Sequence, residues 1–197
     1  MLLDILRQFN WFDIFIVFLL LKIGYTSVKN GFVVELFKFL GTVFAIYISF
    51  HYFTVLSDIF MKRVPDEQGF PLPFMDYVVC LVLIISIYLF FVLLRNLVCH
   101  FVKMEAVPTL SKWGGFILGI GRGIIVSSLI AFLFFISTVD YLSASAKNSY
   151  ISRRIFNVSI STYDAAWNGL MNKLAPNEKH NRTITEIQQN YFAENTK

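Results

Sequence analysis

Four charged side chains lie inside or at the edges of strongly apolar stretches, where a charge needs a partner: Arg122, Glu35, Lys38 and Asp13. An isolated charge in an apolar environment costs a few kcal/mol or more unless it meets an opposite charge, backbone carbonyls or water. Glu35 is the preferred partner of Arg122, and Asp13 is the second choice. We expect a structural ion pair in preference to a role in conduction or gating.

Residues typical of a catalytic or metal site do not accompany these charges. His51, His100 and His180 fall in three different regions, so a shared metal site is not expected. The sequence contains no paired-histidine zinc motif, no phosphate-binding loop and no serine with a nearby histidine. We therefore predict that the protein is not an enzyme and that it binds no cofactor or metal.

The composition points to an integral membrane protein. Hydrophobic residues make up 56% of the 197 residues and charged residues only 15%, and the mean hydropathy is +0.63. A soluble domain does not have such values. The 17 lysines and arginines give a net charge of +4, but they are scattered and mostly flank apolar runs. Membrane flanks explain this pattern better than nucleic-acid binding, which we do not expect.

Four apolar stretches are long enough to cross a membrane as helices. They cover residues 11–28, 32–53, 76–94 and 113–139, with a tight polar turn at Lys29-Asn30-Gly31 between the first two. The predicted fold is an all-α integral membrane bundle of four transmembrane helices in residues 1–140. A juxtamembrane amphipathic helix in residues 141–176 and a flexible polar tail in residues 177–197 follow it.

Glu35 and Lys38 lie near the start of the second stretch, three residues apart on one helical face. They either pair with each other across one turn or extend separately to the lipid headgroups, because both are within about two turns of the predicted boundary. The sequence leaves these two alternatives open.

Small residues recur at every fourth position of the last stretch, and they predict a groove for helix packing: Gly115, Gly119, Gly123, Ser127 and Ala131. Such a groove lets another backbone come close, which favours helix association in lipid. The small face of the second stretch is the expected neighbour, and Gly31 and Gly41 are further packing candidates. Because the groove drifts by about 40° every four residues, we expect its second half to meet another subunit or a shared axis.

The polar C-terminal region contains one amphipathic pattern. Its apolar positions follow helical spacing on one face and comprise Phe156, Ile160, Tyr163, Trp167, Leu170 and Leu174. We expect this helix to lie flat on the membrane surface, with this face in the headgroup boundary. Packing of the same face against a neighbouring subunit is the alternative.

The distribution of basic residues predicts the orientation, because cytoplasmic ends of membrane helices carry more lysine and arginine. Three basic residues precede the tail on the side of the termini: Arg7, Lys62 and Arg63. Seven lie in or beside the two opposite turns: Lys22, Lys29, Lys38, Arg95, Lys103, Lys112 and Arg122. This bias predicts that both termini are outside the cytoplasm, although Lys147, Arg153 and Arg154 of the tail weaken it.

Two segments resemble the bacterial colicin V production (CvpA) family. The first combines Asn10-Trp11-Phe12-Asp13, Gly24, Lys29-Asn30-Gly31-Phe32-Val33-Val34-Glu35-Leu36 and Gly41, and the second is residues 113–123 with Gly115, Gly119 and Arg122-Gly123. The resemblance implies a multi-pass protein of the bacterial inner membrane with four spans. It also implies a link to colicin V export, and hence to toxin production, and to envelope maintenance.

Two functions therefore compete. The first is a non-enzymatic accessory protein or scaffold for toxin export and envelope homeostasis, and it depends on the family resemblance. The alternative is a small oligomeric channel, because a helix lined with glycine, alanine and serine resembles the pore helix of small-conductance mechanosensitive channels. The expected partners are membrane lipid and either further copies of the chain or other inner-membrane proteins.

Overall fold

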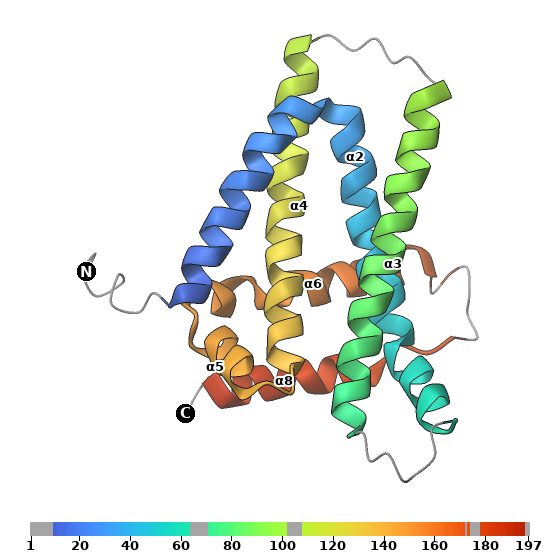
Figure 1. Cartoon of the computed structure of the whole chain (residues 1–197), viewed down its shortest axis with the longest axis vertical. Helices are drawn as coiled ribbons and strands as arrows, with labels where there is room; N and C mark the ends of the chain where they lie inside the picture. The colour runs from blue at the N-terminus through green and yellow to red at the C-terminus, as the bar shows by residue number, and fades with distance from the viewer. Residues whose placement is uncertain (1–9, 64–70, 102–107, 172, 174–177, 196–197) are drawn as a thin grey trace.

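The computed structural model describes residues 10–63, 71–101, 108–171, 173 and 178–195, and these contain helices but no strand. The all-α prediction is therefore confirmed. Long helices form the bundle in Figure 1: α2 (Trp11–Met61), α3 (Leu72–Phe101) and α4 (Pro108–Ile136). Shorter elements follow: α5 (Asp140–Asn148), α6 (Tyr150–Ala166), the π-helical turn η2 (Trp167–Met171) and α8 (Arg182–Asn195).

Three helices of the described chain are long and apolar enough to cross a membrane, where the sequence predicted four: Trp11–Met61, Leu72–Val98 and Ser111–Ile136. The difference lies in α2, which joins the first two predicted stretches into 51 residues. Gly31 interrupts its helical geometry with φ 75° and ψ 172°, a conformation that essentially only glycine adopts. Figure 1 shows that α2 bends there into an inverted V. We call residues 11–30 the first arm and residues 32–61 the second arm.

Three glycines of α4 pack against the first arm of α2: Gly115, Gly119 and Gly123. A Cβ atom added to Gly115 would lie 2.8 Å from the carbonyl oxygen of Ser27 and 2.9 Å from the carbonyl carbon of Gly31. A Cβ added to Gly119 would overlap the Ser27 side chain, and Gly123 also faces this arm. The expectation that the second stretch occupies this groove is wrong, because the turn at Gly31 places the first arm against it.

The second half of the groove is covered within the chain. Ser127 and Ala131 are fully buried, so the expectation that they meet another subunit is wrong. At the neighbouring position of α4, the helix α6 packs against it: the Ser128 hydroxyl donates to the Phe156 carbonyl at 2.9 Å and accepts from the Ser159 N–H at 2.8 Å. The groove is therefore a packing surface inside one molecule.

The helix α3 packs against the second arm of α2 at Gly41. A Cβ atom added to Gly41 would lie 2.8 Å from the Cβ of Phe91 in α3. The opposite side of α3 carries exposed apolar side chains, including Ile85, Leu89 and Leu93. This helix is therefore the least covered of the three long helices.

The apolar face that α6 shares with the first residue of η2, Trp167, is buried in protein. The exposed fractions are 0% for Phe156, 1% for Ile160, 0% for Tyr163 and 7% for Trp167, because α6 packs against α4 and α2. The expectation that this face inserts into the headgroup boundary is therefore wrong for these four residues. The side chain of Leu170 and all of Leu174 lie outside the described residues.

Residues 182–195, which the sequence assigned to a flexible tail, form the helix α8. Ile184 and Tyr191 are fully buried, and the Tyr191 ring stacks on Phe156 with a centroid distance of 3.6 Å. These two apolar side chains lie seven residues apart, which is two helical turns, and they dock α8 onto α6. The predicted boundary between an amphipathic helix and a free tail is therefore wrong, since the two segments pack as one layer.

Replacement of Gly115 by alanine should destabilise the bundle by about 1–3 kcal/mol, as overpacking of a tight contact does. The added methyl group would meet the backbone of Ser27 and Gly31, which cannot rotate away. Thermal unfolding of the purified protein in mild detergent measures the effect. Gly121→Ala is the matched control, because its Cβ would meet only Phe39 at 3.8 Å. Equal unfolding temperatures for the two variants would contradict the close approach.

Candidate functional site

A buried ion cluster joins the two arms of α2 to α4. The Glu35 Oε2 atom lies 3.0 Å from Nη2 and 3.1 Å from Nε of Arg122, and its Oε1 atom lies 3.1 Å from Nζ of Lys38. The Glu35 side chain is fully buried, and the Arg122 side chain is 8% exposed. One carboxylate thus serves two cations. Of the two alternatives for Glu35 and Lys38, the structure shows the pair between them, and Glu35 also pairs with Arg122 as expected.

The turn at Gly31 positions this cluster. Asn30 precedes the turn and donates its side-chain N–H to Oε1 of Glu35 at 2.6 Å. Phe32 follows it and donates its backbone N–H to the Ser111 hydroxyl of α4 at 3.1 Å. The first N–H groups of a helix have no partner inside the helix, so Ser111 satisfies one of those at the start of the second arm. The turn and the ion cluster are therefore held by the same helix, α4.

The chemistry available to this cluster is structural. The Glu35 carboxylate accepts hydrogen bonds from a guanidinium, an ammonium and an amide, which together stabilise its charged form. A carboxylate occupied in this way has no free oxygen for a substrate. The described residues also contain no group of three or more His, Cys, Asp or Glu side chains that could hold a metal ion.

Asp13 lies elsewhere and caps α6. Its Oδ1 atom accepts hydrogen bonds from the Ser149 hydroxyl at 2.6 Å and the Ile151 N–H at 2.7 Å, while Oδ2 accepts from the Tyr150 N–H at 3.2 Å. Oδ2 also accepts from the Asn10 N–H at 2.8 Å at the start of α2. The expectation that Asp13 is the second choice for Arg122 is wrong, because a helix N-terminus is itself an anion site.

A second polar cluster connects the second arm of α2 to the C-terminal helices, and no local sequence pattern predicts it. His51 Nδ1 lies 3.2 Å from the Tyr163 hydroxyl, and His51 Nε2 lies 3.0 Å from a Glu178 oxygen. The Asn181 N–H donates to the same tyrosine oxygen at 3.1 Å, and its side chain donates to the Phe50 carbonyl at 2.7 Å. Burial raises the pKa of the Tyr163 hydroxyl. The contacts of His51 and Phe50 with the C-terminal region span more than 100 residues of sequence, so only the fold brings these residues together.

A comparison with protein-family models finds a match to the colicin V production protein over residues 12–160. This range covers well over half of the chain. The chain belongs to the colicin V production protein family. The family resemblance noted in the sequence is thus confirmed. Comparisons with curated proteins and with solved structures find no match.

The family match includes each charged residue described above except those of the C-terminal segment. Asp13, Glu35, Lys38 and Arg122 lie within it, whereas Glu178 and the whole of α8 lie beyond its end. The ion cluster and the cap on α6 therefore belong to the part of the chain that matches the family, and the contacts of α8 are an addition at its C-terminal side.

Glu35→Gln should destabilise the protein more than Arg122→Gln does. The first change leaves two cations without a carboxylate, whereas the second leaves the Glu35–Lys38 pair intact. Breaking a buried pair costs about 3–5 kcal/mol, and we expect Glu35→Gln to fall in that range. Thermal unfolding of the purified variants in detergent measures this loss of stability, and the abundance of each variant in the membrane provides a second measure. A Glu35→Gln variant as stable as the wild type would show that the ion cluster contributes nothing to the stability of the protein.

Asp13→Asn should loosen the C-terminal helices while leaving the membrane helices in place. The amide keeps one acceptor oxygen but cannot accept all four bonds, and the loss of a cap costs about 1–2 kcal/mol. Limited proteolysis between α5 and α8 should become faster. Asp58→Asn is the matched control because Asp58 is exposed. The same digestion rate for both variants would argue against the cap.

Proposed function

We propose that this chain is a non-enzymatic, multi-pass protein of the bacterial inner membrane that supports colicin V production or export and envelope homeostasis. The observation that carries the proposal is the family match over residues 12–160, together with apolar helices long enough to cross a membrane. Its partners in this role are membrane lipid and other inner-membrane proteins or further copies of the chain.

The use of the polar side chains supports a scaffold. Glu35 and Asp13 are fully buried and bonded to other parts of the same chain, and His51 is 8% exposed and held between Tyr163 and Glu178. Side chains bonded to the same chain in this way stabilise the fold. A stable fold is what an accessory protein needs in order to bind its partners. The channel alternative loses its main argument, because packing within the chain accounts for the small residues of α4.

We further propose that the two arms of α2 cross the membrane separately, which gives four crossings and puts both termini on one side. The first arm is long enough at about 1.5 Å per residue, or about 30 Å in all. Basic residues of the turn end, including Lys29, Arg95 and Lys112, favour placing that end in the cytoplasm and the termini in the periplasm. The basic residues Arg153 and Arg154 of α6 act against this bias.

The function is tested in a colicin V-producing bacterium that lacks its own member of the family. Expression of this chain should restore the zone of growth inhibition around the colony, and Glu35→Gln should restore less because the protein is less abundant. Toxin measured separately in cells and medium distinguishes production from export, and survival in membrane-active detergents measures envelope integrity. No restoration by a wild-type chain that reaches the membrane would reject the proposal.

The orientation is tested with reporters fused after Lys197. A reporter that is active only in the periplasm should be active there, and one that is active only in the cytoplasm should be silent. A second fusion within residues 102–107, between α3 and α4, should give the opposite pair of results. The same pair of results at both positions would mean that the chain crosses the membrane an even number of times between them. That outcome would reject the proposed topology.

A further inference from the structure

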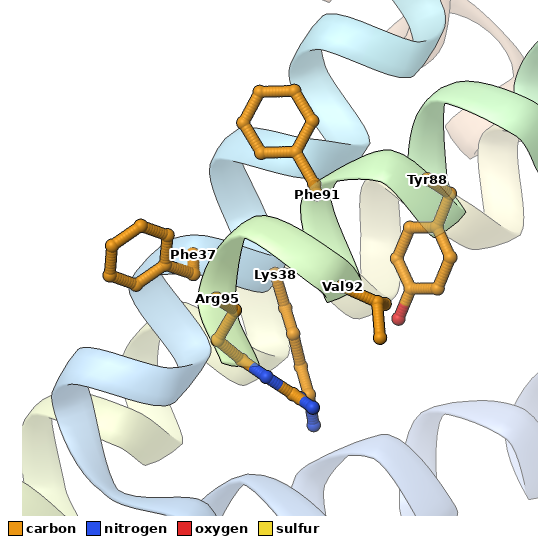
Figure 2. Close-up of a pocket in the computed structure, with 6 residues that line it drawn as sticks. All are labelled: Phe37, Lys38, Tyr88, Phe91, Val92 and Arg95. Carbon is orange, nitrogen blue, oxygen red and sulfur yellow. The ribbon is translucent and has the colours of Figure 1, made fainter. Parts of the chain in front are cut away.

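One pocket lies beside the ion cluster and shares Lys38 with it. It lies between the second arm of α2 and α3 and is lined by Phe37, Lys38, Tyr88, Phe91, Val92 and Arg95. Figure 2 shows that the Lys38 and Arg95 side chains extend in the same direction, while the rings of Phe37 and Phe91 point away from their nitrogen atoms. Two cations from different helices therefore lie along one apolar crevice.

Positive charge around this crevice exceeds negative charge. Lys38 pairs with Glu35, but that carboxylate is also bound to Arg122. The Arg95 guanidinium donates to the side-chain oxygen of Asn96 at 2.7 Å and 3.2 Å, which is a neutral acceptor. In the part of the chain that the structure describes, no carboxylate pairs with Arg95. Lys38 and Arg122 thus share one carboxylate and Arg95 has none among the described residues, so the crevice carries an excess of positive charge that an anion would balance.

We propose that the mouth of this pocket binds the phosphate of an anionic phospholipid, with Arg95 and Lys38 as its ligands. A guanidinium presents two parallel N–H donors that match phosphate oxygens, and an ammonium adds a point charge. A lipid fits better than a soluble phosphate because Phe91, which lines the crevice, stacks on the partly exposed ring of Phe44 in the second arm. Acyl chains would cover these side chains while the headgroup meets the cations. The site does not depend on the proposed role in colicin V production.

Native mass spectrometry of the full chain in mild detergent tests the site, with short-chain phosphatidylglycerol and phosphatidylcholine as probes. The wild type should bind phosphatidylglycerol about tenfold more tightly, because its headgroup carries a net negative charge. Arg95→Gln should reduce that affinity about tenfold, and Arg95→Lys should fall between the two. Lys112→Gln is the matched control: it removes an exposed charge at the same end of the bundle and should change the affinity by no more than about twofold.

Three results would overturn the proposal. Equal affinities of the wild type for phosphatidylglycerol and phosphatidylcholine would show that the site does not select an anionic headgroup. This measurement does not depend on the folding of any variant. Equal losses of affinity for phosphatidylglycerol in Arg95→Gln and Lys112→Gln would show that the lipid is attracted to the basic surface in general and not to this site. Competition by millimolar inorganic phosphate would identify a soluble ion as the ligand. Gel filtration and helical circular dichroism check that each variant keeps the fold of the wild type.

Discussion

The close contact between the backbone of Gly115 in α4 and the turn at Gly31 in α2 is the constraint on which the other contacts depend. Helices in lipid gain little from burying apolar surface against each other, so they associate through close packing and polar bonds. Gly31 supplies the reversal that only glycine allows, and Gly115 supplies the space for its carbonyl. A side chain at either position would force the first arm away from α4.

The reversal also determines where the charges meet. Glu35 follows Gly31 by one helical turn, and Arg122 follows Gly115 by about two turns on α4. Once the two glycines are in contact, the carboxylate and the guanidinium lie on facing sides of the helices at 3.0 Å. A buried charge without its partner is costly, so the pair penalises any other register of these helices. Shape and charge therefore select the same arrangement.

Polar contacts make the C-terminal helices part of the bundle. Asp13 holds the start of α6, Ser128 holds its middle, and His51 holds Tyr163 near its end. Each contact joins a long helix to α6 through a buried side chain. The apolar face of α6 is consequently covered by α4 and α2, which explains why it is not available to the membrane surface. Figure 1 shows α5, α6 and α8 gathered at the end where the arms of α2 separate.

The sequence by itself determined the membrane character, the helices, the turn at Lys29-Asn30-Gly31 and the family, because hydropathy and glycine conformations are local properties. It also identified Arg122 as a charge that needs a partner and ranked Glu35 first. Only the tertiary structure decided that the first arm fills the groove of α4, since a line of small residues accepts any close backbone. Likewise, the amphipathic pattern of α6 fits lipid or protein equally well, and contacts from residues far away in the chain made the choice. The polar composition of α8 concealed Ile184 and Tyr191, whose burial depends on a partner that no local pattern reveals.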